Sequence, residues 1–144
     1  MSDPTSAAQA RYQDPETIRR ILGYARTIAV VGLSSNPGRP SYGVAQYLRD
    51  QGFQIIPVNP REAEVLGQKS YATLAEVPVP IDVVDVFRAP EFVPAVADEA
   101  IAVGARSLWL QLGVISPESA ARAAAAGLDV VMDRCLKIDH ESQR

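Results

Sequence analysis

The residues of this chain that are best suited to chemistry are three arginines and a loop of small residues. Gly32, Leu33, Ser34 and Ser35 follow an apolar run, and Arg39 lies in the same loop. Arg61 and Arg88 each follow another apolar run. Guanidinium groups bind phosphates through charge-assisted hydrogen bonds, and the exposed amides of a glycine turn also bind them. The pattern predicts a nucleotide-like anion as ligand, while a solvated loop position remains the alternative for each arginine.

Few other residues point to catalysis. Cys135 and His140 are the only residues of their kinds, which excludes an internal disulfide, a cysteine-rich zinc site and a multi-histidine metal centre. Cys135 is interpreted as a small residue after the last strand rather than as a nucleophile. Asp85 lies within an apolar run and needs a hydrogen-bond partner, which favours a structural role. We therefore expect no catalytic residue and no metal ligand; whether the protein is an enzyme stays open, with binding favoured.

Apolar runs and helical patterns alternate along the chain. Residues 28–31 form an unbroken apolar run, as a parallel strand covered on both faces requires. Further strands are predicted at 53–58, 81–88, 107–112 and 128–132, and helices at 16–25, 41–51, 90–103 and 118–126. This alternation predicts an α/β fold, a single-domain Rossmann-like doubly wound parallel sheet with helices on both faces. Residues 1–13 are predicted to be a mobile segment and 14–144 the domain, in which 133–144 is a polar tail of uncertain form.

The predicted strand order brings distant segments together. A short edge strand at 69–72 would give the order 3-2-1-4-5-6, with the 82–87 strand beside the 28–31 strand. Such sheets bind ligands at the carboxyl ends of the strands where the winding reverses. Trp109, in the middle of its strand, is expected in the core, whereas Gln111 could meet either a backbone group or the ligand. The residues predicted to form the site are Gly32, Leu33, Ser34, Ser35, Arg39, Asn59, Pro60, Arg61, Phe87, Arg88, Ala89, Gln111, Leu112 and Gly113.

The loop after Gly32 does not have the spacing of a classical dinucleotide site. The motif G-x-G-x-x-G is absent, because Leu33, Ser34 and Ser35 follow the glycine. A classical NAD site also carries an acid at the end of the second strand to hold the ribose hydroxyls, and Asn59 stands there instead. This counts against NAD, although Arg61 leaves NADP possible.

Composition narrows the class of protein further. The chain has 144 residues, 47% hydrophobic and 22% charged, as expected for one soluble globular domain. Its net charge of -3 argues against general nucleic-acid binding, which needs clustered Lys and Arg. No apolar stretch could span a bilayer, residues 1–10 lack the features of a signal peptide, and a single cysteine fits a reducing compartment. We expect a cytoplasmic protein with no membrane contact.

The motifs, taken in order, resemble a known family. They are VVGLS at 30–34 with Pro37 and Arg39, PVNP at 57–60, DVVDVFR at 82–88, WLQLGV at 109–114 and VMDRC at 131–135. As a set they resemble the small stand-alone CoA-binding proteins of bacteria and archaea. Those proteins are similar to the N-terminal CoA-binding domain of the succinyl-CoA synthetase alpha subunit. The likeness runs from about residue 14 to residue 135.

This resemblance implies a Rossmann-like domain that holds coenzyme A by its nucleotide and diphosphate. The implied contacts fall at 32–35, 59–61, 87–89 and 111–113. The synthetase alpha subunit also has a second domain with a phosphorylated histidine, which this sequence does not show, and His140 does not match that motif.

The leading hypothesis is a non-catalytic CoA or acyl-CoA binding protein with coenzyme A as its ligand. An NAD(P)-binding oxidoreductase, a dinucleotide-binding regulator and a subunit of an acyl-CoA ligase are the alternatives. A protein partner or a homo-oligomer is left open.

Overall fold

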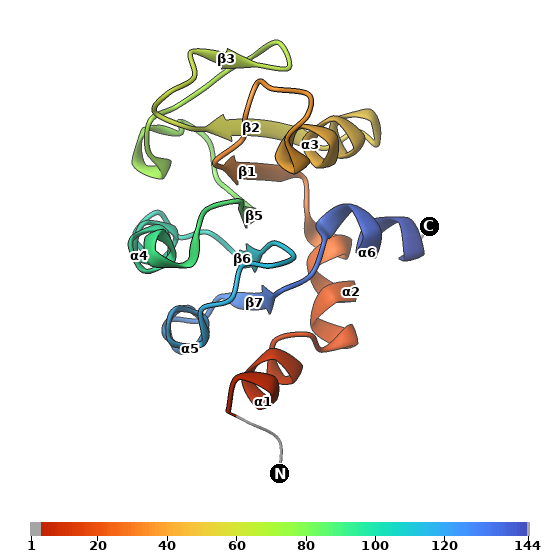
Figure 1. Ribbon diagram of the computed structural model, residues 1–144, viewed down its shortest axis with the longest axis vertical. Helices are drawn as coiled ribbons and strands as arrows, with labels where there is room; N and C mark the ends of the chain where they lie inside the picture. The colour runs from red at the N-terminus through yellow and green to blue at the C-terminus, as the bar shows by residue number, and fades with distance from the viewer. Residues whose placement is uncertain (1–3, 144) are drawn as a thin grey trace.

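A five-stranded parallel sheet forms the centre of the protein (Figure 1). The computed structural model describes residues 4–143, and residues 1–3 and 144 lie outside the described part. The strands are β1 (Thr27–Val31), β2 (Gln54–Val58), β5 (Val83–Val86), β6 (Ser107–Leu110) and β7 (Asp129–Met132). Their order in space is β2-β1-β5-β6-β7. The winding therefore reverses between β1 and β5, which confirms the predicted Rossmann-like fold.

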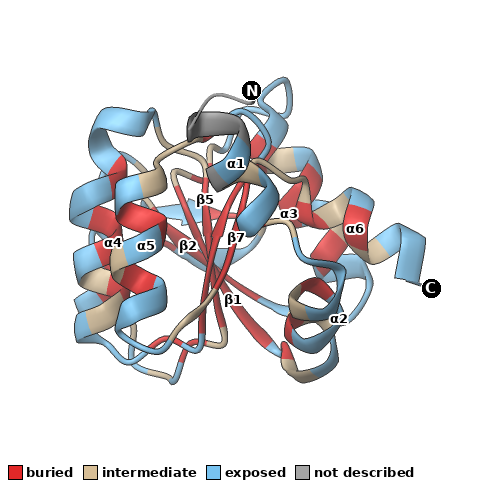
Figure 2. Cartoon of the chain, turned by 90° about the horizontal axis from the view of Figure 1, so that it is seen from below, coloured by how far each residue is buried: buried red, intermediate tan, exposed pale blue. Residues whose placement is uncertain are grey.

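Helices cover both faces of this sheet (Figure 2). One face carries α2 (Pro15–Tyr24), α3 (Pro40–Asp50) and α6 (Leu136–Gln143), and the other carries α4 (Val93–Ala102) and α5 (Pro117–Ala125). Alternate residues of β1 enter the two cores: Ile28 and Val30 pack on the α2–α3–α6 side, and Ala29 and Val31 pack on the α4–α5 side. Every residue of β1 is buried, which explains why residues 28–31 are continuously apolar rather than alternating.

Local signals in the sequence set the ends of several helices. Asp14 caps α2, because its carboxylate accepts a hydrogen bond from the Thr17 amide at 3.3 Å, and Pro15 occupies the first helical position. Pro117 begins α5, and Pro90 begins a short 3-10 turn, η2 (Pro90–Phe92), that leads into α4. The predicted helices at these places are confirmed.

Of the predicted edge strand at 69–72, Tyr71 alone pairs with the main sheet. Instead, β3 (Glu64–Val65) and β4 (Gln68–Lys69) form a separate antiparallel pair, and η1 (Leu74–Glu76) follows. The chain reverses through Leu66 and Gly67, both at positive φ, so β4 pairs with β3 rather than with β2. Tyr71 forms an isolated parallel bridge to Val58: its amide donates to the Pro57 carbonyl at 3.0 Å, and its carbonyl accepts from the Asn59 amide at 2.8 Å. The main sheet therefore ends at β2.

Both ends of the described chain are ordered as helices. Residues Pro4–Arg11 form α1, and the Gln9 amide donates a hydrogen bond to Asp133 at 2.9 Å. The Met132 amide donates to the Tyr12 carbonyl at 2.9 Å, which ties this segment to β7. The mobility of residues 1–13 stays a prediction.

The polar tail after residue 133 is the helix α6. Arg134 donates to the buried Asp139 at 3.0 Å, and the Tyr47 hydroxyl lies 2.7 Å from His140 Nδ1. The Tyr47 contact joins α6 to α3, and α6 also packs against α2 on the same side of the sheet.

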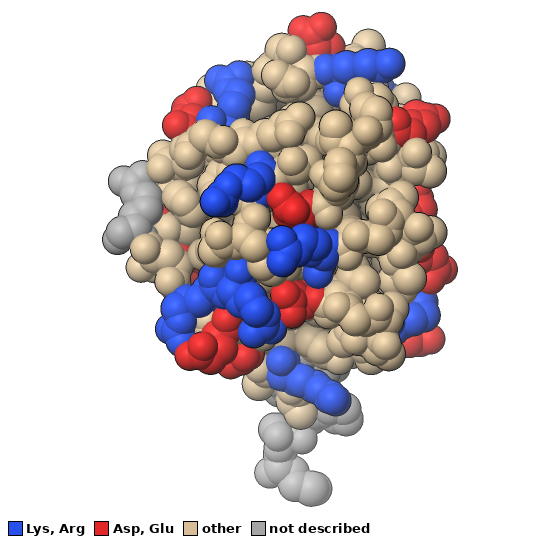
Figure 3. Space-filling model, turned by 180° about the vertical axis from the view of Figure 1, so that it is seen from behind, with Lys and Arg blue, Asp and Glu red and all other residues tan. Residues whose placement is uncertain are grey.

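Among the described residues, no helix combines the length and the apolar character needed to cross a bilayer. Acidic and basic side chains are interspersed on the face of the molecule shown in Figure 3 rather than gathered into one basic patch. This mixture agrees with the net charge of -3.

Candidate functional site

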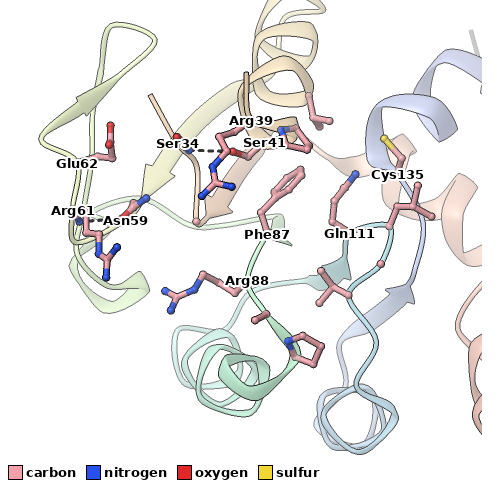
Figure 4. Close-up of a pocket in the computed structure, with 18 of the residues that line it drawn as sticks. Ser34, Arg39, Ser41, Asn59, Arg61, Glu62, Phe87, Arg88, Gln111 and Cys135 are labelled. Carbon is pink, nitrogen blue, oxygen red and sulfur yellow. Dashed lines mark hydrogen bonds between the residues drawn. The ribbon is translucent and has the colours of Figure 1, made fainter. Parts of the chain in front are cut away.

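A crevice of about 750 Å³ opens at the carboxyl ends of the strands, where the winding reverses between β1 and β5 (Figure 4). Its volume lies within the range of roughly 300–1,000 Å³ that is usual for small-molecule and cofactor sites. Most of the residues predicted for the site line it: Gly32, Ser34, Arg39, Asn59, Arg61, Phe87, Arg88, Ala89, Gln111, Leu112 and Gly113. The structure therefore brings together segments that are distant in sequence.

Leu33, Ser35 and Pro60 do not line the crevice. The Leu33 side chain is fully buried in the core beneath α3, so only its backbone could face a ligand. Ser35 and Pro60 are exposed in their loops.

Gly32 occupies the closest approach between the ends of β1 and β5. Its φ is +88°, a left-handed conformation that side chains disfavour. A Cβ at this position would lie 2.4 Å from the Phe87 carbonyl oxygen and 3.1 Å from Arg88 Cδ. The Gly32 amide also donates to the Val58 carbonyl at 2.8 Å, which joins the end of β2. Three strand ends therefore meet at a residue without a side chain.

The loop after Gly32 is held by its own side chains. The Ser34 amide donates to the Ser41 hydroxyl at 3.1 Å, and the Asn36 amide donates to the Ser34 hydroxyl at 3.0 Å. Arg39 is the N-cap residue of α3 but makes no capping hydrogen bond with its side chain, and Pro40 is the first helical residue. The positive end of α3 therefore opens on the crevice, where it favours an anion.

Asn59 joins the two loops on one side of the crevice. Its side-chain amide donates to the Leu33 carbonyl at 3.0 Å, and its side-chain oxygen accepts from the Arg61 amide at 2.9 Å. An ionised aspartate could not make the first bond, because it has no donor. Asn59 therefore positions the backbone of the site, a role that differs from that of the ribose-binding acid in a classical NAD site.

Three arginines turn their guanidinium groups toward the same part of the crevice in Figure 4: Arg39, Arg61 and Arg88. Within residues 4–143, no carboxylate lies within 4.0 Å of any of them, whereas Arg20, Arg122 and Arg134 are all paired with aspartates. The Arg88 guanidinium stacks 4.2 Å above the Phe92 ring, which orients it without neutralising it. This end of the crevice is suited to bind more than one phosphate.

Sequence reasoning missed several residues that line the crevice: Pro40, Ser41, Val44, Glu62, Pro90, Val114, Cys135 and Ile138. Cys135 directly precedes α6 and Ile138 lies in its first turn, and this helix has no clear apolar periodicity in the sequence. Glu62 lies beside Arg61 in sequence at the charged end. The described residues include no group of three or more His, Cys, Asp or Glu side chains that could hold a metal ion.

Asp85 lies on β5, in register with Val30 of β1 and Trp109 of β6. The expectation that it has a hydrogen-bond partner is wrong, because both carboxyl oxygens are buried and no described residue contacts them by a hydrogen bond. Burial raises the pKa of the Asp85 carboxyl well above its usual value. Asp85 is therefore a group of the hydrophobic core and does not enter the crevice. Trp109 is fully buried, as predicted, and its indole nitrogen donates to the Arg134 carbonyl at 2.8 Å.

Both the sequence and the fold of this chain are similar to those of known proteins. The sequence profile of the CoA binding domain family matches residues 26–141. An uncharacterised Bacillus subtilis protein, YneT, is 42% identical over 123 residues, which cover 85% of this chain and 91% of that protein. A solved structure from Thermus thermophilus superposes with a TM-score of 0.86 at 37% identity and covers 92% of this chain and 100% of its own.

A larger enzyme also contains a similar region. The alpha subunit of acetate–CoA ligase [ADP-forming] II from Pyrococcus furiosus is 39% identical over 69 residues. That match covers 47% of this chain and 15% of the ligase subunit, so the likeness concerns one part of the larger protein.

Proposed function

The chain belongs to the CoA binding domain family, and we propose that it binds coenzyme A or an acyl-CoA in the crevice at the ends of β1 and β5. The crevice provides a cavity of suitable size, a glycine turn and the N-terminal end of α3.

The observation that carries the proposal is the convergence in one crevice of three arginines that have no ion pair with any described carboxylate. Coenzyme A has a diphosphate and a separate 3′-phosphate, so it offers charge at more than one point. Arg39 and Arg88 border the loop and the end of β5, and we assign the diphosphate to them. Arg61 follows β2, on the far side of Asn59, and we assign the 3′-phosphate to it. A ligand with one carboxylate would leave part of this positive charge unmatched.

We further propose that the isolated chain holds the ligand without converting it. Within the described part of the chain, the crevice has no histidine, and its cysteine, Cys135, lies at the apolar end rather than among the arginines. The similarity to a ligase alpha subunit supports one second candidate, a binding subunit that works with a separate catalytic partner. In that case too, the chemistry would depend on residues that this crevice does not supply.

Calorimetric titration of the purified protein with CoA, acetyl-CoA, NAD and NADP tests the proposal. We expect CoA to bind at least about tenfold more tightly than NAD, which corresponds to about 1.4 kcal/mol. The physical reason is that Asn59 is committed to the backbone of both loops and offers no carboxylate to the NAD ribose. Equal affinity for the two ligands, or tighter NAD binding, would contradict the assignment.

A further inference from the structure

The end of the crevice away from Arg61 has a different character. Leu112, Val114, Cys135 and Ile138 line it, and Figure 4 shows Cys135 at the opposite end from Arg61. Leu112 is 64% exposed and Ile138 is 57% exposed, although both are large and apolar. They come from different elements, the loop after β6 and the helix α6, and both border one cavity. An apolar surface continuous with a charged site suits a ligand that is polar at one end and aliphatic at the other.

Gln111 lies between these two ends and has a free hydrogen-bond donor. The residue is only 4% exposed, and its side-chain oxygen accepts from the Leu136 amide at 3.3 Å. That bond fixes which end of the side chain is the oxygen, since the backbone amide can only donate. No described residue accepts from the side-chain nitrogen, which points toward the space between Phe87 and Cys135 in Figure 4. A donor that faces the crevice in this way can bind a ligand that brings an acceptor.

We propose that the preferred ligand is the thioester of CoA with an aliphatic acyl group several carbons long, rather than free CoA. Gln111 Nε2 donates a hydrogen bond to the thioester carbonyl oxygen, and Leu112, Val114 and Ile138 cover the acyl chain. The inference rests on the proposed function, which sets the orientation of the ligand in the crevice. If the phosphates of CoA lie among the arginines, its pantetheine arm leads away from them, toward Gln111 and the apolar end.

Carbonyl oxygens also occur in the two amides of the pantetheine arm, so the test must separate them from the thioester. Four ligands do this in calorimetric titrations: CoA, acetyl-CoA, hexanoyl-CoA and S-hexyl-CoA. The last is a thioether that keeps the chain but lacks the thioester carbonyl. We expect hexanoyl-CoA to bind about tenfold more tightly than acetyl-CoA. Each fully buried methylene group raises affinity by up to about fourfold, and a methylene group at the open edge of the crevice raises it by less. We expect it to bind about fivefold more tightly than S-hexyl-CoA, the effect of one neutral hydrogen bond.

Substitutions test which residues cause the preference for hexanoyl-CoA over acetyl-CoA and over S-hexyl-CoA. Leu112→Ser and Ile138→Ser should each reduce the ratio between hexanoyl-CoA and acetyl-CoA to about threefold or less, because an exposed apolar contact is lost. Val103→Ser is the matched control: Val103 is 36% exposed at the end of α4, lies outside the crevice and should leave the ratio unchanged. Gln111→Met keeps the length of the side chain but removes the donor, so hexanoyl-CoA and S-hexyl-CoA should bind this variant equally.

The outcomes are distinct. Equal affinity of the wild-type protein for acetyl-CoA and hexanoyl-CoA would overturn the acyl-chain assignment while leaving CoA binding intact. An equal loss of affinity for CoA, hexanoyl-CoA and S-hexyl-CoA in Gln111→Met would place the donor on a pantetheine amide and overturn the thioester assignment. If that variant does not fold, the wild-type comparison of hexanoyl-CoA with S-hexyl-CoA still decides the point. Failure of CoA and every thioester to bind would contradict the proposed function itself.

Discussion

A side chain at Gly32 would place its Cβ 2.4 Å from the backbone carbonyl oxygen of Phe87. The ends of β1 and β5 can therefore lie at their observed separation only because residue 32 has no side chain. The packing of the strands alone therefore requires a glycine at position 32. The close approach of a ligand diphosphate to the backbone would be a second reason for a glycine there.

Gly32→Ala should be more destabilising than an ordinary glycine substitution. The positive φ costs about 1–2 kcal/mol for any side chain, and the displacement of Phe87 adds to this. Gly127→Ala is the matched control, because Gly127 has φ +98° but nothing within 4 Å of its Cβ position. Urea denaturation of both variants measures the difference. A Gly32 variant no less stable than the Gly127 variant would show that the strand ends can separate freely.

Asp85 should make the protein less stable as the pH rises. Because burial raises the pKa of this carboxyl above its usual value of 3.8, the folded state keeps a proton that the unfolded state releases. Its contribution to stability is present below pH 3.8 and is lost as the pH rises toward the folded-state pKa, by at most about 1.4 kcal/mol per pH unit.

Asp85→Asn cannot titrate, so this contribution disappears. The free energy of unfolding of wild type minus that of the variant, measured by urea denaturation from pH 4 upward, should fall with pH. A difference that stays constant or increases would mean that the Asp85 carboxyl is ionised in the folded protein.

Asp139 should be needed to dock α6. It is 3% exposed and accepts two hydrogen bonds from the Arg134 guanidinium. Asp139→Asn should lower the free energy of unfolding by about 1–3 kcal/mol, because a buried charge-assisted contact is lost. Glu141→Gln, on the same helix, removes only an exposed pair with Lys137 and should change stability by less than about 0.5 kcal/mol. Equal effects of the two variants would show that the Arg134 contact does not hold the helix.

Arg61 should distinguish CoA from dephospho-CoA, which lacks the 3′-phosphate. Arg61→Ala should weaken the binding of CoA about tenfold, the effect of one charge-assisted contact, and should be nearly silent with dephospho-CoA. The control is Arg19→Ala, which removes an exposed arginine of α2 outside the crevice. If Arg61→Ala weakens the two ligands equally, Arg61 contacts a part that they share, and the 3′-phosphate lies elsewhere.

The parts of the fold that could be predicted are those with a strong physical signal in the sequence. Residues 28–31 of β1 are apolar without a break because both faces of the sheet are covered. The alternation of strands and helices indicates a parallel sheet. Once β1 and β5 are neighbours, the topology alone places the ends of β1, β2, β5 and β6 around one crevice. This is why most of the predicted residues line it.

The rest depends on contacts that leave little trace in a sequence. Only Leu136 and Asp139 are buried in α6, and the second is charged, so the helix resembles a solvated tail. Leu33 and Ser34 are neighbours in one loop, yet Leu33 enters the core and Ser34 lines the crevice. The Asp85 carboxyl has no described partner, against the general rule that buried polar groups are paired.

The most direct test of CoA binding in this crevice is a calorimetric titration of CoA into Arg88→Ala beside wild type. Arg122→Ala is the control, because Arg122 pairs with Asp98 outside the crevice. Loss of a hydrogen bond to a charged group should weaken CoA binding by about 1.5–3 kcal/mol in Arg88→Ala and leave Arg122→Ala like wild type. The loss should shrink at high salt, where the attraction is screened. If Arg88→Ala is folded and binds CoA as tightly as wild type, CoA does not bind in this crevice.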